Sequence, residues 1–363
     1  REIAQNLAPV SDSNWIRLQL RQTVEMKAIL EFDDPLPGGH FPSVSRILDR
    51  ASIDGNYLLE DEFLKLLHWL NAIRLIRIYI EKRKTKYPAL AALLQLSTFD
   101  TSFSKSIEQV ISPEGTVLTS ASKELTGIRR DLNEKSSALR VLLDRILRNA
   151  RSQGWAEDLD LTIRNDRLVI PMKADFRGRI QGFIHDISAT GNTIFLEPTD
   201  ALNYNNEIRE LKAREKNEIL RILTELTSQL RPLLPEYENF LWFLVQVDLL
   251  RAKAKLAIRL QASEPIIVED ASELEIIRGK HPLLILQKQE VVPLHLHLDP
   301  QRRIMLISGP NADGKSVALK TTGLLQVMTQ TGILIPADDR SRIPVLQKLF
   351  VDIGDDQSLQ NDL

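Results

Sequence analysis

The chain has 363 residues, of which 43% are hydrophobic and 26% are charged. This composition is typical of a folded globular protein and excludes a wholly disordered chain. Lys and Arg number 47 against 49 Asp and Glu, so nucleic-acid binding would need a local basic patch and not bulk charge. The absence of cysteine excludes a disulfide scaffold, Cys-ligated zinc and thiol catalysis. It fits a reducing compartment, and we expect a cytoplasmic protein without a membrane partner, since no apolar run is long enough to cross a bilayer.

The N-terminal part of the sequence predicts helices. Apolar residues recur at helical spacing between residues 15 and 29, after a run of capping-type residues at 11–14. A second helix is expected over about 60–84, ended by Pro88, and a short one near 89–96. We therefore predict a helical core or lever domain over residues 1–122.

Two long helical patterns flank a β-rich stretch. We predict a first arm over 123–151, and a second arm with return helices over 204–262, because apolar residues recur every three or four positions with charges between them. An antiparallel coiled coil and two ordinary bundle helices both fit this pattern. Between them, alternation predicts strands at 159–170, 178–187 and 192–196, which form a clamp domain over 152–203.

After an acidic stretch at 263–275, the sequence becomes α/β in texture. We predict the N-terminal half of a P-loop ATPase domain over 263–363. Its motif fits G-x-x-x-x-G-K-[ST] and consists of Gly309, Pro310, Asn311, Ala312, Asp313, Gly314, Lys315 and Ser316. A buried strand is expected at 303–308 before the motif, and a helix at 316–330 after it.

The motif's residue types suit a nucleotide phosphate group. The loop's backbone N–H groups and the helix N-terminus would surround phosphate oxygens. Lys315 would neutralise the β- and γ-phosphates, and Ser316 would ligate Mg²⁺. ATP and Mg²⁺ are therefore the predicted cofactors. Asp313 places a carboxylate beside this cradle, which weakens ATP binding if it points inward and is harmless if it points to solvent.

Smaller features of the sequence give further predictions. The clamp's basic residues are candidate nucleic-acid contacts, against a simple solvated face; they are Arg164, Arg167, Lys173, Arg177 and Arg179. The first arm is also basic, with the same two interpretations. His295, His297 and Asp299 alternate on one strand and have a spacing that can bind metal, although a structural role suffices. Trp155 lies in an apolar run and is expected to pack, not to stack on bases.

Several stretches together give the sequence a family resemblance. The P-loop, the preceding residues 279–284 and 291–293, and the stretches 165–173, 185–186, 193–198, 205–207 and 350–358 resemble the MutS family. They are most similar to its second bacterial subfamily, the paralogues that bear an Smr domain and lack the mismatch-recognition domain. The likeness is strongest from about residue 120 to 363.

This resemblance implies a homodimeric ATPase that binds nucleic acid. The expected target is branched or double-stranded DNA, with suppression of recombination; the alternative is stalled or collided ribosomes and their rRNA, which such an ATPase would split. A third alternative is an architectural coiled-coil dimer regulated by ATP. The Walker B carboxylates, the signature loop and an Smr endonuclease domain are expected beyond Leu363, so catalytic residues are not assigned and the chain is expected to be a fragment.

The resemblance also implies roles for single residues. His281, Val291 and Pro293 would lie next to the adenine. A structural role is the alternative for His281, and core packing explains the two apolar residues equally well. Gln357 follows the stretch at 350–354 and would sense the γ-phosphate or the attacking water.

Overall fold

The computed structural model describes residues 5–37, 42–96, 102–156, 158–269, 273–288, 290–308 and 314–352. The chain divides into two compact units. Unit 1 comprises residues 1–41, 71–99 and 235–363, and unit 2 comprises residues 42–70 and 100–234. Within the described ranges, no helix combines the length and the apolar character needed to span a membrane.

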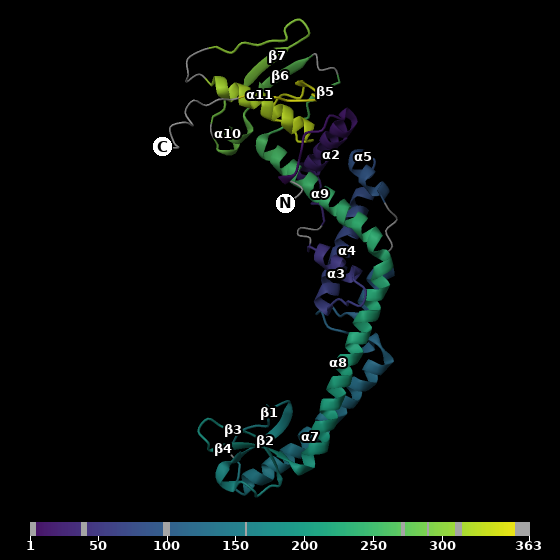
Figure 1. Ribbon diagram of the computed structural model, residues 1–363, viewed down its shortest axis with the longest axis vertical. Helices are drawn as coiled ribbons and strands as arrows, with labels where there is room; N and C mark the ends of the chain where they lie inside the picture. Colours follow the sequence, from purple (N-terminus) through teal and green to yellow (C-terminus); the bar gives the residue numbers. More distant parts are fainter. Residues whose placement is uncertain are drawn as a thin grey trace. The chain divides into compact units, whose positions relative to one another are not determined.

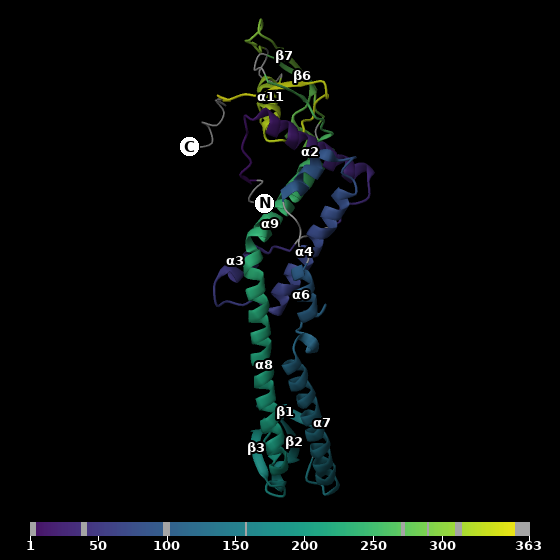
Figure 2. The ribbon, with the colours of Figure 1, turned by 90° about the vertical axis from the view of Figure 1, so that its right-hand side faces the viewer.

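Unit 2 is built on two long helices, α7 (Lys123–Ser152) and α8 (Leu202–Leu230), as the sequence predicts. They run side by side (Figure 2) and are antiparallel. Two ion pairs fix this direction: Arg129 Nε lies 2.7 Å from Glu215 Oε1, and Lys135 Nζ lies 2.6 Å from Glu207 Oε2. Higher numbers on α7 thus pair with lower numbers on α8.

A single hydroxyl ties the start of α7 to α8. Ser122 is the N-cap of α7, and its Oγ accepts a hydrogen bond from the Leu125 N–H at 2.9 Å. The same Oγ donates to Glu218 Oε1 at 2.7 Å. Hydrogen bonds from the Arg221 guanidinium lower the pKa of Glu218 to about 2, so this carboxylate stays charged.

Four antiparallel strands form the clamp sheet, in the order β1-β2-β4-β3. They are β1 (Thr162–Arg164), β2 (Arg167–Lys173), β3 (Gly182–Ile187) and β4 (Thr193–Pro198). They lie beside one end of the α7–α8 pair (Figure 1). The predicted single strand over 159–170 is wrong. Asn165 and Asp166 both have positive φ, 50° and 60°, and make a two-residue turn between β1 and β2.

The clamp sheet packs on α7 through one apolar stripe. Leu139, Leu143 and Leu147 recur every four residues, so they lie on one face of the helix. They bury against Ile170 and Met172 of β2, and against Ile194 and Leu196 of β4. The clamp is therefore fixed to the arm by a continuous hydrophobic core.

The remaining elements of unit 2 are short. They are α3 (Ser45–Ser52), α6 (Ser102–Val110), and the 3₁₀ turns η2 (Thr119–Ala121), η3 (Ala174–Phe176), η4 (Thr199–Ala201) and η5 (Arg231–Leu233). Helix α4 (Glu60–Glu81) contributes residues to both units. The sequence did not predict α3 or α6, because two turns of helix give too few repeats of the apolar spacing.

Unit 1 combines helices with a second sheet. The helices are α2 (Ser13–Phe32), α5 (Pro88–Ala91) with η1 (Ala92–Leu96), α9 (Leu234–Leu260), α10 (Pro282–Leu286) and α11 (Lys315–Gln330). The strands are β5 (Ile266–Val268), β6 (Leu274–Gly279), β7 (Leu294–Leu298) and β8 (Arg342–Pro344), in the order β5-β8-β6-β7. Only β5 and β8 are parallel, so the sheet is mixed.

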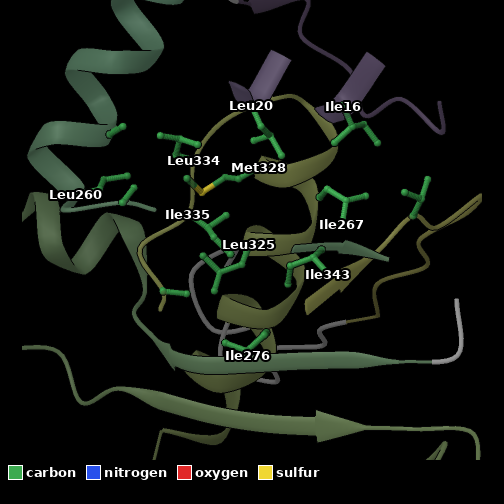
Figure 3. Close-up of a cluster of buried hydrophobic side chains, with 14 of the residues drawn as sticks. Ile16, Leu20, Leu260, Ile267, Ile276, Leu325, Met328, Leu334, Ile335 and Ile343 are labelled. Atoms are coloured by element: carbon green, nitrogen blue, oxygen red, sulfur yellow. The ribbon is translucent and has the colours of Figure 1, made fainter. Parts of the chain in front are cut away.

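Helix α11 lies at the centre of the unit 1 core. Its residues Leu325 and Met328 pack with Ile16 and Leu20 of α2 and with Ile276 of β6 (Figure 3). Close approach of β6 requires a glycine. A Cβ on Gly279 would lie 2.4 Å from Ile276 Cγ2 and 3.1 Å from Leu325 Cδ1. The position of α11 is thus fixed by apolar contacts on both sides.

Candidate functional site

The predicted phosphate loop ends at the first residue of α11. Gly314 has a φ of 78°, in the left-handed region that glycine adopts without strain. Lys315 and Ser316 follow as the first helical residues, where backbone N–H groups lack acceptors within the helix. The positive end of the helix dipole adds to these donors. Gly309–Asp313 lie outside the described residues, as does Gln357.

The C-terminal end of the same helix is held by a buried lysine, which the sequence analysis did not single out. Lys253 of α9 is 3% exposed, and its Nζ donates to the Thr331 carbonyl at 2.9 Å. Gln19 Oε1 lies 3.4 Å from the same nitrogen. Burial lowers the pKa of Lys253 to about 8. A cation at the negative end of a helix is favourable, and it anchors α11 to α9.

Lys253 predicts a particular pH dependence of stability. Between the folded pKa of about 8 and the ordinary value of 10.5, the unfolded chain binds more protons than the folded one. The free energy of unfolding therefore rises with pH through this window, by about 1–2 kcal/mol up to about pH 9.5. Below about pH 8, the folded protein carries the full cost of burying the charged Lys253. Urea unfolding across this range should show the rise in wild type and a flatter profile in Lys253→Met. The exposed Lys255→Met is the matched control, and equal slopes in wild type and Lys253→Met would contradict the assignment.

An apolar hollow of about 680 Å³ runs along α11. His281, Leu319, Gly323 and Val351 contribute to its lining. Burial, and to a lesser extent the charge of Lys320, lower the pKa of His281, so the ring is neutral at pH 7. The predicted adenine neighbours Val291 and Pro293 precede β7 and are not part of this lining.

The strand predicted before the phosphate loop is wrong for this structure. Residues 303–308 form no strand, and Ile304 and Leu306 are 91% and 90% exposed. Phe350 and Val351 are likewise exposed and outside any strand. The reason is a lack of neighbours: a buried parallel strand needs partners on both edges, and no described residue pairs with these segments.

The alternating histidines of β7 do not form the trio that their spacing suggested. His297 Nε2 lies 3.2 Å from Asp299 Oδ2, while His295 is exposed. Backbone and side-chain hydrogen bonds from Arg302 lower the pKa of Asp299 to about 2. His297 instead comes near two carboxylates of β6 and its approach, Glu273 and Glu275, with ligand atoms within 4.8 Å of one another. Arg342 Nε lies 2.9 Å from Glu273 Oε2, so a cation of the chain already neutralises this group.

In the clamp, one predicted contact residue belongs to a buried polar network. Arg167 Nη1 donates to Glu197 Oε1 at 2.6 Å, and Asn205 Nδ2 donates to the same oxygen at 2.8 Å. His185 Nε2 lies 2.6 Å from Glu197 Oε2. Glu197 is 1% exposed, and we therefore assign Arg167 to the interior of the clamp. Only one signal in the sequence pointed to this network: the carboxylate of Glu197 directly follows three apolar residues, 194–196, in β4.

The other clamp cations lie at its surface. Arg164 pairs with Asp186 at 2.9 Å and covers the Phe195 ring at 4.2 Å, which binds β1 to β3 and β4. Arg177 and Arg179 are exposed and Lys173 is half-buried. For these three side chains we find no ion pair with any residue in the described part of the chain.

The basic residues of the first arm divide in the same way. Arg129, Arg130, Lys135 and Arg151 are ion-paired with neighbouring carboxylates. Farther along α7, toward the clamp, Arg145 and Arg148 are exposed and have no ion pair to a described residue. Lys123 and Arg140, earlier on α7, are likewise exposed and without an ion pair to a described residue. We name the cations without an ion pair that lie on the clamp or in the last two turns of α7 the tip cations: Arg145, Arg148, Lys173, Arg177 and Arg179.

Two comparisons with known proteins found similar sequences. Residues 305–362 match the family model described as MutS domain V. Proteins named Endonuclease MutS2 from Alkaliphilus oremlandii, Lactobacillus helveticus and Clostridium botulinum are each 35% identical over 100% of this chain. The chain covers 46% of each, so it spans about half the length of the curated relatives it matches.

Proposed function

Since the chain belongs to the MutS family and is MutS2-like, we propose that it joins an ATP-binding site to a clamp that grips nucleic acid. The observation that carries the nucleotide site is the order of three residues. Gly314 has a left-handed backbone and is followed directly by Lys315 and Ser316, the first residues of α11, whose C-terminal half packs in the core. This layout suits a bound phosphate group. Lys315 would pair with the β- and γ-phosphates, and Ser316 would hold Mg²⁺.

For the clamp, the supporting observation is the distribution of unpaired charge. The tip cations lie together on the clamp and on the adjoining part of α7. Nearer the start of α7, Arg129, Arg130 and Lys135 are ion-paired, and Lys123 and Arg140 are not paired with any described residue. Phosphate backbones bind such unpaired Lys and Arg side chains by releasing counterions. Relatives named Endonuclease MutS2 support a nucleic-acid substrate for the whole protein. We propose branched DNA as that substrate, bound by a cytoplasmic homodimer.

Binding at matched salt tests this proposal. Gel shift should show tighter binding of a four-way junction than of a linear duplex of equal length. Neutralising Arg177 and Lys173 to Gln should weaken both by a similar factor and make the slope of log affinity against log salt shallower by about 2. Arg129→Gln is the control for a paired cation. Co-sedimentation with stalled disomes, without any junction preference, would overturn the DNA proposal in favour of the ribosome.

Asp313 offers a test of the phosphate cradle itself. If its carboxylate faces the phosphates, Asp313→Gly removes a like charge within a few ångströms and should strengthen ATP binding about ten-fold. Fluorescence titration with a labelled ATP analogue measures this. An unchanged affinity would place the carboxylate in solvent, and a weaker one would mean that Asp313 supports the loop backbone.

A further inference from the structure

A second hollow, of about 560 Å³, lies within unit 2 beside the clamp sheet. Arg145 and Asn149 of α7 form one wall, Trp155 lies beyond the end of that helix, and Arg179 and Gln181 come from the loop before β3. Asp200, after β4, completes the polar lining. The volume is in the usual range for pockets that hold a small organic group.

The hollow combines an anchored aromatic ring with two unneutralised cations. Trp155 is half-buried and packs against the clamp core. This packing restrains the orientation of the ring, which also lines the hollow. The guanidinium carbon of Arg179 lies 5.9 Å from the ring centroid, at the outer limit of a cation–π contact. Arg145 and Arg179 are exposed, and neither is ion-paired within the described ranges. The contact with Trp155 therefore leaves most of the bonding capacity of Arg179 unused.

We propose that this hollow receives one unpaired nucleotide of the bound nucleic acid. The base stacks on the Trp155 ring, and its phosphate accepts hydrogen bonds from Arg145 and Arg179. The amides of Asn149 and Gln181 can both donate to and accept from a base edge. This assignment rests on the proposed nucleic-acid clamp and adds to it a preference for unstacked bases, which branch points and loops supply and a linear duplex does not.

The lining argues for a nucleotide unit over simpler ligands. An isolated phosphate would bind the cations but would gain nothing from the ring and would offer Asp200 no hydrogen-bond donor. An apolar ligand would leave two guanidinium groups and a carboxylate without partners. A base with exocyclic amino groups satisfies Asp200 as an acceptor while its phosphate satisfies the cations.

The test uses a four-way junction with one unpaired 2-aminopurine at the branch and an otherwise identical, fully paired junction. Wild type should bind the first about ten-fold more tightly, and its 2-aminopurine fluorescence should be quenched on binding. Trp155→Leu keeps an apolar side chain in the core but should lose both the preference and the quenching. Its affinity for the paired junction should change less than two-fold. Trp242→Leu, which changes a 47% exposed tryptophan of unit 1, is the matched control.

Arg179→Gln gives an independent variant, since its exposed side chain is not needed for folding. It should lower affinity for the unpaired junction more than for the paired one. An RNA hairpin with the same unpaired base tests whether the nucleotide comes from RNA or from DNA. Tighter binding of the unpaired form over the paired form, in either nucleic acid, supports the assignment. Equal affinity of wild type for both junctions, or undiminished quenching in Trp155→Leu, would overturn the proposal that the hollow binds a nucleotide. The clamp proposal would remain intact. Failure of wild type to bind any of these nucleic acids would overturn both.

Discussion

Glu197→Ala should lower the free energy of unfolding of unit 2 by about 3–5 kcal/mol, because it removes one partner of a buried ion pair. Glu197 is 1% exposed and Arg167 is 16% exposed, so the guanidinium would be left with little access to water. Asn205, 3% exposed, would lose the acceptor of one of its amide hydrogens. A loss of this size corresponds to a fall of roughly 10 °C in Tm for a unit of this size.

Glu207→Ala is the matched control for this prediction. This variant removes a carboxylate from the same unit. Glu207 Oε2 lies 2.6 Å from Lys135 Nζ, but both side chains are nearly half exposed. Such a surface pair is worth about 0–1 kcal/mol. Thermal unfolding followed by circular dichroism compares the two variants. Equal, small losses would show that the Glu197 network does not hold the clamp together.

Lys315→Ala should weaken ATP binding about ten- to hundred-fold, since hydrogen bonds to charged groups contribute about 1.5–3 kcal/mol. Lys315 is the first residue of α11, directly after left-handed Gly314, and the proposed site uses its ammonium group to neutralise the bound phosphates. Titration with a fluorescent ATP analogue in the presence of Mg²⁺ measures the loss. The binding of nucleic acid without nucleotide should be unchanged.

Lys348→Ala controls for charge, because this lysine is exposed in the same unit. Its affinity for ATP should match that of wild type. If Lys315→Ala and Lys348→Ala bind the analogue equally well, the motif does not form the nucleotide site. That result would overturn the proposal that unit 1 binds ATP through this motif.

The long elements of this fold could be predicted from the sequence, because they repeat their pattern many times. Helices α7 and α8 each carry an apolar stripe through about eight turns; both ends of α7 and the start of α8 were predicted within about two residues of their observed positions. Short elements give no such repetition. The turn at Asn165 and Asp166 interrupts an alternation that reads as one strand, and only the tolerance of these two residues for positive φ could have revealed it.

The candidate sites were predictable to the degree that they depend on local sequence. The predicted P-loop motif is contiguous, so its spacing alone was enough to predict a phosphate site. By contrast, the role of Arg167 depends on residues 30 to 39 positions away, Glu197 and Asn206, which no local pattern connects. The hollow beside Trp155 joins a helix, two loops and a strand end, so the sequence indicated packing for Trp155 where the structure shows packing and a cavity wall together.

The central claim is that nucleic acid contacts the tip of unit 2. Photocrosslinking tests it most directly: a four-way junction carrying 4-thiothymidine near the branch is bound to the chain, irradiated and digested, and the crosslinked peptides are identified by mass spectrometry. The account predicts crosslinks concentrated in residues 145–181, which include all five tip cations, and their loss in the Lys173→Gln, Arg177→Gln variant. Crosslinks confined to unit 1, with none in residues 145–181, would contradict it.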